Sequence, residues 1–136
     1  MTPRQIQLVT SSFALLTSDS AQVAARFYTR LFEMDPGLRA LFKGDMKAQE
    51  QKFMQMLAVI VHSMEPLEQV IPVVWPMGKR HAGYGVRPEH YATVGAALLE
   101  TLAQQLGAEF SGEIREAWSA AYALLALTMQ HAAEAC

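Results

Sequence analysis

The sequence predicts an all-α protein with six to eight helices and no sheet. Helix start signals recur along the 136 residues, and the segments between them are short. β-Branched residues cluster only at 59–61 and 70–74, and prolines flank or interrupt the second cluster. The apolar fraction of 51% is enough to build one core. We therefore expect a single domain over residues 1–136.

The first helix begins with three overlapping signals. Thr2 is an N-cap, Pro3 occupies the first helical position, and Gln5 completes a capping box. Apolar residues then recur at helical spacing as far as Leu16. The polar stretch 17–20 predicts a break, after which a second helix begins.

Two further helices are expected before residue 65. The Asp-Pro pair at 35–36 caps and opens a short helix that ends near residues 42–45. A long helix is predicted from about residue 46 to about residue 64.

The second half of the chain contains two long helices and one short one. Pro76 is expected to open a short helix that carries His81, which leaves residues 66–75 loosely ordered, because a proline inside a helix loses a hydrogen bond. The Arg-Pro-Glu sequence at 87–89 begins a helix that Gly107 ends. The Ser-Gly-Glu sequence at 111–113 caps the last helix, which runs to about residue 134.

Charge and composition exclude several classes of protein. The net charge is −2 and the pI about 6.1, so no basic surplus indicates a nucleic-acid partner. The longest apolar runs are too short to cross a membrane, and residues 1–5 lack the apolar core of a signal peptide. The single cysteine, Cys136, excludes an internal disulfide. These features predict a cytoplasmic protein, as a monomer or a weak homodimer.

The segment 79–95 is the most informative one for function. It combines a histidine at the end of a short helix, a glycine-rich corner and the start of a new helix. A histidine at a helix C-terminus has two interpretations. His81 can be stabilised as a cation by the helix dipole, or it can serve as a metal ligand in its neutral form.

Five segments, in the same order and register, resemble bacterial single-domain globins and the globin domain of flavohaemoglobins. They are residues 25–32 (ARFYTRLF), 36–42 (PGLRALF), 49–53 (QEQKF), 79–95 (KRHAGYGVRPEHYATVG) and 117–122 (AWSAAY). The resemblance covers nearly the whole chain. It implies a globin fold, which is a 3-over-3 helical sandwich around haem b (iron protoporphyrin IX).

On the proximal side, the resemblance implies that His81 is the iron ligand. The partner of its other ring nitrogen stays open between the carbonyl of Met77 and the hydroxyl of Tyr91. The family's proximal glutamate falls on Ala133 in this chain. Glu134 stands one residue later, which rotates it by about 100° on a helix. Whether Glu134 substitutes for the displaced glutamate stays open, and a complete relay from histidine through tyrosine to glutamate is not expected.

On the distal side, the resemblance implies catalytic roles for Tyr28 and Gln49. A phenol O–H and an amide N–H can both donate to negative charge on a bound diatomic ligand in a dry pocket. Gln49 also lies four residues before Phe53, so the two share a helix face. Gln51 and Gln55 are the alternatives, but neither has this spacing.

The remaining residues assigned to the cofactor are mostly apolar. Phe42 is expected to pack flat on the porphyrin, and Lys79 and Arg80 to pair with its propionates, although solvated surface charge is an equal alternative for both cations. The complete set of cofactor-binding residues is Phe42, Phe53, Leu57, Lys79, Arg80, His81, Tyr84, Val86, Tyr91 and Val94.

The other three histidines are interpreted without a haem role. His62 lies about 220° round the helix from Gln49 and is expected to face away from the haem. His90 is expected to make a structural hydrogen bond in the first turn of its helix, and His131 to lie on the surface.

Three functions are compatible with these residues. The first is oxygen-dependent nitric oxide dioxygenation, which needs an external reductase because 136 residues leave no room for a flavin domain. The alternative is a non-enzymatic carrier, store or sensor of O2 or NO, including oxygen transport. CO is a further expected ligand. Peroxidase-like or nitrite-reducing chemistry ranks third, because the sequence lacks an obvious distal acid–base pair.

Overall fold

Six α-helices joined by short 3₁₀ turns make up the regular structure of residues 1–65 and 69–134, which are the residues that the computed structural model describes. The elements are α1 (Pro3–Leu16), η1 (Thr17–Asp19), α2 (Ser20–Met34), η2 (Pro36–Leu41), α3 (Met46–His62), α4 (Val70–Gly83), α5 (Pro88–Leu106), η4 (Gly107–Glu109) and α6 (Gly112–Glu134). This part of the chain contains no strand. The prediction of an all-α fold is therefore confirmed.

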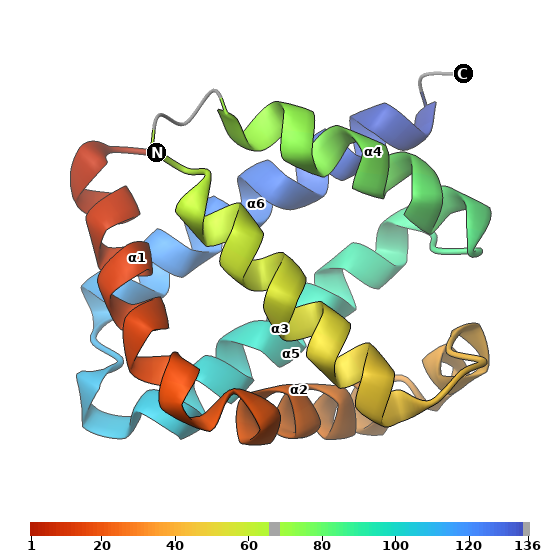
Figure 1. The fold of residues 1–136 in the computed structure, drawn as a ribbon, viewed down its shortest axis with the longest axis horizontal. Helices are drawn as coiled ribbons and strands as arrows, with labels where there is room; N and C mark the ends of the chain where they lie inside the picture. The colour runs from red at the N-terminus through yellow and green to blue at the C-terminus, as the bar shows by residue number, and fades with distance from the viewer. Residues whose placement is uncertain (66–68, 135–136) are drawn as a thin grey trace.

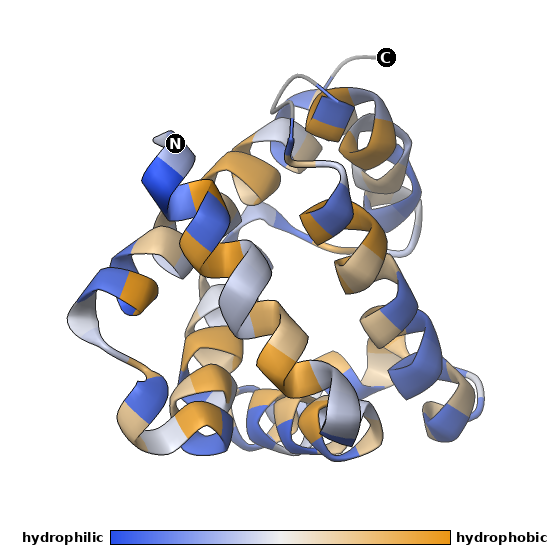
Figure 2. Cartoon of the chain, turned by 60° about the vertical axis from the view of Figure 1, so that its left-hand side comes forward, coloured by the Kyte–Doolittle hydropathy of each residue, from blue (hydrophilic) through white to orange (hydrophobic). Residues whose placement is uncertain are grey.

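The helices cross one another around a shared interior. In Figure 1, α1, α3 and α4 pass in front of α5 and α6, and α2 runs along the lower edge. The main packed pairs are α4 with α6, α1 with α6, and α2 with both α5 and α3. Hydrophobic and hydrophilic residues alternate along each helix in Figure 2, as expected for helices that bury one face. Within the described residues, no helix is both long and apolar enough to cross a membrane.

Three of the predicted helix ends are confirmed by local geometry. The Thr2 hydroxyl accepts from the backbone N–H of Gln5 at 3.1 Å, and the Gln5 side chain accepts from the backbone N–H of Thr2 at 2.9 Å. Ser111 accepts through its hydroxyl from the first turn of α6. Gly107, which ends α5, has φ 56°, a conformation that favours glycine. Each of these ends depends on residues within a few positions, so the sequence could predict them.

The prediction for the segment before His81 is wrong. α4 is continuous from Val70 to Gly83 and contains Pro76 in its interior, so residues 70–75 are helical rather than loosely ordered. The rest of the predicted loose segment, residues 66–68, lies outside the described residues. Packing explains the difference, because Val74, Met77 and Gly78 are buried where α4 meets α6. This tertiary contact outweighs the hydrogen bond that Pro76 cannot make.

Replacing Pro76 with alanine is expected to stabilise the protein by about 1–2 kcal/mol. The alanine N–H can donate to the carbonyl of Pro72, and this gain exceeds the extra freedom of the unfolded chain. Urea unfolding followed by far-ultraviolet circular dichroism measures the change. Pro72→Ala is the matched control, because Pro72 lies in the first turn of α4, where the N–H has no partner within the helix. An equal response of the two variants would contradict this explanation.

Candidate functional site

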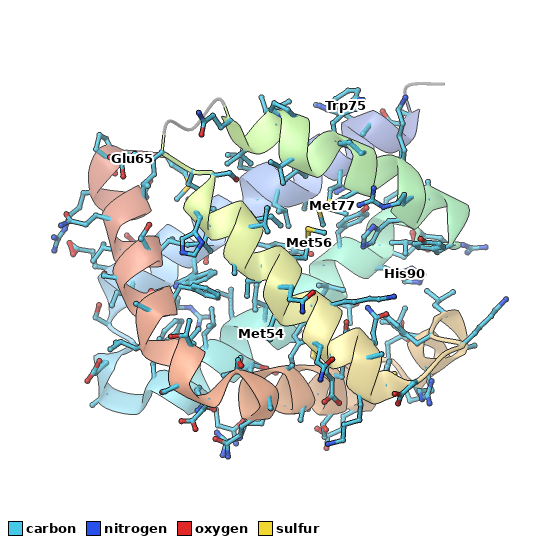
Figure 3. All side chains as sticks on the ribbon, viewed as in Figure 1. Met54, Met56, Glu65, Trp75, Met77 and His90 are labelled. Carbon is cyan, nitrogen blue, oxygen red and sulfur yellow. The ribbon has the colours of Figure 1, made fainter. Side chains whose placement is uncertain are left out.

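A cavity of about 460 Å³ lies between the helices, and residues from α2, η2, α3, α4, α5 and α6 line it. Its volume is within the range of roughly 300–1,000 Å³ that is typical of ligand-binding pockets. Most of the lining side chains are apolar. In Figure 3, Met56 from α3 and Met77 from α4 both project towards the centre of the molecule, and both line this cavity. Thioether side chains of this kind adapt to irregular apolar shapes.

His81 lies in the last turn of α4 and lines the cavity. Its Nδ1 is 2.7 Å from the carbonyl oxygen of Met77, four residues earlier. Because a carbonyl only accepts, Nδ1 donates, and Nε2 of the neutral ring carries no hydrogen. Of the two partners considered from the sequence, the structure therefore has Met77 rather than Tyr91.

The surroundings of His81 favour the neutral ring. Burial lowers the pKa of His81 below its usual value, and the positive charge of Arg80 acts in the same direction, while the Met77 carbonyl opposes them. A neutral imidazole with a bare Nε2 is the form that binds a metal ion. The alternative interpretation, a cationic histidine that caps the helix, does not fit this direction of the pKa shift.

Tyr28 and Gln49 meet on another wall of the cavity. The Gln49 side-chain amide donates to the Tyr28 hydroxyl at 3.1 Å. Since Tyr28 accepts this bond, its own O–H hydrogen stays free to donate to something else. The Tyr28 ring is 5% exposed and packs edge-on against Phe42 and Phe53. Burial raises the pKa of Tyr28 to about 12, so the hydroxyl stays protonated at neutral pH.

The structure brings together all but one of the residues assigned from the sequence. The residues that line the cavity are Tyr28, Phe42, Gln49, Phe53, Leu57, Arg80, His81, Tyr84, Val86, Tyr91 and Val94. Lys79 does not line it and is exposed. Gln51 and Gln55, the alternatives to Gln49, do not line it either.

His62 and His90 have the surroundings expected from the sequence, but His90 also contributes to the cavity. His62 does not line the cavity, and its ring packs edge-on against Phe13. His90 accepts from the backbone N–H of Arg87 at 3.0 Å, which is the expected structural bond. However, His90 also lines the cavity, and Figure 3 shows it on the side where α4 leads into α5.

Several lining residues escaped the sequence analysis. Lys52 follows Gln49 by three residues on α3, so helical spacing could have identified it. Lys43 lies in the irregular segment after η2, where no periodicity points to the cavity. Tyr122 lines the cavity and donates through its hydroxyl to the backbone carbonyl of Tyr91 at 2.6 Å. This contact joins residues on two helices, which no local pattern indicates.

The charges that line the cavity are all positive. Lys43, Lys52 and Arg80 line it, and no carboxylate of the described residues does. Glu134 is exposed and does not reach the cavity, so it is not a partner of His81. Nor do the described residues contain any group of three or more side chains that could hold a metal ion by themselves. The site therefore offers one imidazole, one phenol–amide pair, apolar walls and cations.

Alkaline pH is expected to destabilise this site, because buried tyrosines resist ionisation. In the folded chain the pKa of Tyr28 is about 12, and burial also raises the pKa of Tyr122. Above pH 10 the unfolded chain loses these protons first, so stability falls as the pH rises. Tyr28 alone accounts for a loss of about 2 kcal/mol by pH 12. Urea unfolding at stepped pH measures this, and a Tyr28→Phe variant with the same alkaline slope would contradict it.

Comparisons with known proteins agree with this architecture. A family model described as Globin matches residues 25–129. The chain is 32% identical over 126 residues to the flavohemoprotein of Bacillus subtilis (strain 168), which covers 90% of this chain and 32% of that protein. It is 32% identical over 129 residues to the flavohemoprotein of Bordetella parapertussis, with 93% and 32% covered. The flavohemoprotein of Bacillus anthracis is 33% identical over 132 residues, with 93% and 32% covered.

The family model covers most of the chain, and its matched residues run from α2 to α6. The chain spans about a third of the length of these curated relatives. The match therefore concerns only that third of each relative. With the family model matched over residues 25–129, and with six α-helices among the described residues, the chain belongs to the globin family.

Proposed function

We propose that this chain is a haem globin that holds haem b in the central cavity and binds diatomic gases there. The observation that carries the proposal is the hydrogen bond from His81 Nδ1 to the Met77 carbonyl, which leaves a bare Nε2 on a ring that lines the cavity. Haem supplies a redox-active iron with a position for O2, NO or CO. The flavohemoprotein relatives, whose name denotes a haem protein, support this choice.

The donor set of the cavity fits haem. Haem is a flat apolar ring with two carboxylates at one edge, and the lining combines apolar walls with Lys43, Lys52 and Arg80. Cations that line the cavity are suited to pair with propionates. His81 would hold the iron, and the residues that would contact the ring are Phe42, Phe53, Leu57, Tyr84, Val86, Tyr91 and Val94.

The distal pair would stabilise a polar ligand. Gln49 donates to the Tyr28 hydroxyl and so restrains the direction of the remaining O–H. That O–H then donates to negative charge on the ligand in a site from which the surrounding phenyl rings exclude water. Because its pKa is about 12, Tyr28 keeps this proton through the physiological range.

The reaction that we assign to the site is oxygen-dependent oxidation of nitric oxide. One NO, one O2 and one electron give one nitrate ion, and the electron comes from a reductase outside these 136 residues. Tyr28 contributes by retaining O2 until NO arrives. A hydrogen bond to a charged group is worth about 1.5–3 kcal/mol, so retention by this donor is substantial.

A non-enzymatic O2 or NO carrier is the second candidate, and one observation favours it. The partner of His81 is a neutral carbonyl, and no carboxylate lines the cavity in the described residues. A histidine without an anionic partner donates less electron density to the iron. This lowers the expected rate of any chemistry that consumes O2, and it is compatible with reversible binding.

Tyr28→Phe tests the function, with Tyr84→Phe as a matched control at an exposed tyrosine of the same cavity. The O2 dissociation rate of the Tyr28 variant is expected to rise at least about tenfold, which corresponds to 1.4 kcal/mol. The control is expected to change little. Stopped-flow mixing of the O2-loaded protein with NO, with nitrate measured, separates the two candidates. Stoichiometric nitrate supports dioxygenation, and release of O2 without nitrate supports the carrier.

A further inference from the structure

Basic residues are distributed very unevenly along this chain. The two segments 39–52 and 79–87 hold seven of the eleven lysines and arginines but only two of the thirteen acidic residues. The rest of the chain holds four basic and eleven acidic residues. A protein with a net charge of −2 therefore carries a local surplus of five positive charges. We call the seven basic residues of these two segments the basic rim: Arg39, Lys43, Lys47, Lys52, Lys79, Arg80 and Arg87.

The two segments meet at the cavity. Residues 41–44 together with Gln49 and Lys52 line it from the first segment, and Arg80, Tyr84 and Val86 line it from the second. Both segments lie on the right-hand side of Figure 1, at η2 and at the turn from α4 to α5. The positive surplus is thus concentrated on the side of the molecule where these two segments line the cavity.

The surplus is largely unpaired within the described residues. In the basic rim, only Arg87 has an ion pair there, at 3.7 Å from Glu89 on the exposed surface. Elsewhere Arg4 pairs with Glu113 and Arg30 pairs with Glu100. Two propionates of a bound haem would neutralise two of the five surplus charges, so binding of the cofactor leaves the face positive.

Tyr84 gives this face an aromatic centre of contact. Its side chain is 63% exposed, yet it lines the cavity and its ring centroid is 6.2 Å from that of His81. Exposed tyrosines are enriched in protein–protein interfaces, where the rim around them is polar or charged. An aromatic residue within a cationic face is suited to an acidic protein partner.

We propose that the basic rim is the docking surface for an acidic one-electron carrier protein that reduces the haem. The inference rests on the proposed haem site, because Lys43, Lys52 and Arg80 of the rim line the cavity in which the haem would lie. In the transfer, the carrier would give up one electron and a ferric haem held by His81 would accept it, with no bond formed or broken between the proteins. Complementary charge accelerates such encounters about 10–1,000-fold at low salt.

The test uses a reduced acidic flavodoxin as the probe and the haem-loaded chain as the acceptor. The second-order rate constant of haem reduction is followed at the Soret band between about 0.01 M and about 1 M salt. We expect at least a tenfold decrease over this range. The double variant Lys47→Glu/Arg87→Glu, at two rim residues that do not line the cavity, is expected to lose most of this salt dependence and to react at least tenfold more slowly at low salt.

The control makes the same change of net charge elsewhere. Arg4→Glu/Arg115→Glu also replaces two cations with carboxylates, on α1 and α6. It is expected to change the low-salt rate less than about threefold, since these two charges lie outside the basic rim and the attraction between charges falls with distance. Equal slowing of the two double variants would overturn the docking surface, because it would show an effect of net charge alone.

A second readout does not depend on haem. Binding of the chain to fluorescently labelled oxidised flavodoxin is expected at low salt and is expected to be lost in the rim variant. Binding to anionic phosphatidylglycerol vesicles without binding to flavodoxin would overturn the proposal in favour of a membrane surface. Absence of a Soret band would overturn the proposed function, and the flavodoxin isotherm would then decide separately on the docking surface.

Discussion

His81→Ala is expected to remove the haem-dependent Soret band of the purified protein. If the band returns in this variant, we expect it to do so only when imidazole is added to the solution. Removal of the side chain deletes the one imidazole whose Nδ1 is fixed by a backbone carbonyl and whose ring lines the cavity. The affinity for haem is expected to fall by more than the roughly 10–100-fold that loss of a ligand's hydrogen-bond partner costs. Hemin titration of the haem-free protein measures it.

Two control variants make this result specific. His62→Ala removes a histidine that does not line the cavity, and its spectrum is expected to be unchanged. His90→Ala removes the other lining histidine, whose Nδ1 accepts from Arg87, and it is expected to keep the Soret band while destabilising the start of α5. An unchanged spectrum in His81→Ala, with a loss in His90→Ala, would transfer the ligand role to His90.

Local geometry explains why the helix ends and one site contact could be predicted from the sequence. A capping bond such as that of Thr2 with Gln5 joins residues three apart, so the sequence contains everything that it needs. The bond from His81 to the Met77 carbonyl spans one helical turn, and Met77 is one of the two partners that the sequence suggests for this histidine. Interactions within one turn are accessible to pattern reasoning.

Contacts between distant segments set the limit of that reasoning. Tyr28 and Gln49 are 21 residues apart, and only the resemblance to globins placed them in one site. Nothing in the sequence indicated that Tyr122 would donate to the carbonyl of Tyr91, 31 residues away. The sequence did not indicate Lys43 either, for a different reason. A side chain in an irregular segment has no helical period from which its direction could be inferred.

The incorrect break at Pro76 shows a local rule overruled by packing. A proline inside a helix costs a hydrogen bond, and the rule predicts a boundary there. The structure keeps α4 continuous because the helix buries Val74 and Met77 on either side of Pro76, while Pro76 itself is exposed. The free energy gained when α4 buries these side chains against α6 keeps the helix continuous. The sequence alone does not show that α6 is the helix that packs against α4.

Gly78→Ala is expected to destabilise the protein by at least about 2 kcal/mol, because it lies where α4 and α6 cross. A Cβ at this position would be 2.3 Å from the backbone oxygen of Met129 and 2.6 Å from its Cα. Both atoms belong to a helix backbone, which cannot rotate aside as a side chain can. Overpacking of this kind typically costs about 1–3 kcal/mol, and a backbone obstacle places the variant in the upper part of that range.

Two other glycines provide a graded comparison for Gly78→Ala. At Gly95 a Cβ would be 2.6 Å from the ring of Tyr122, a side chain that can shift, so Gly95→Ala is expected to cost less. At Gly83, in the last turn of α4, a Cβ would meet nothing within 4 Å, and alanine favours the helix by up to about 1 kcal/mol. Urea unfolding should therefore show a loss of stability that increases in the order Gly83→Ala, Gly95→Ala, Gly78→Ala.

The same substitution also tests whether the helix crossing positions the site. Gly78 precedes His81 by three residues on α4, so a wider separation of α4 from α6 moves the imidazole relative to the wall that carries Tyr28. We expect Gly78→Ala to weaken hemin binding as well as stability, whereas Gly83→Ala leaves both intact. If Gly78→Ala unfolds at the wild-type urea concentration, the close approach of the two helices does not hold in solution, and the position of His81 must depend on other contacts of α4.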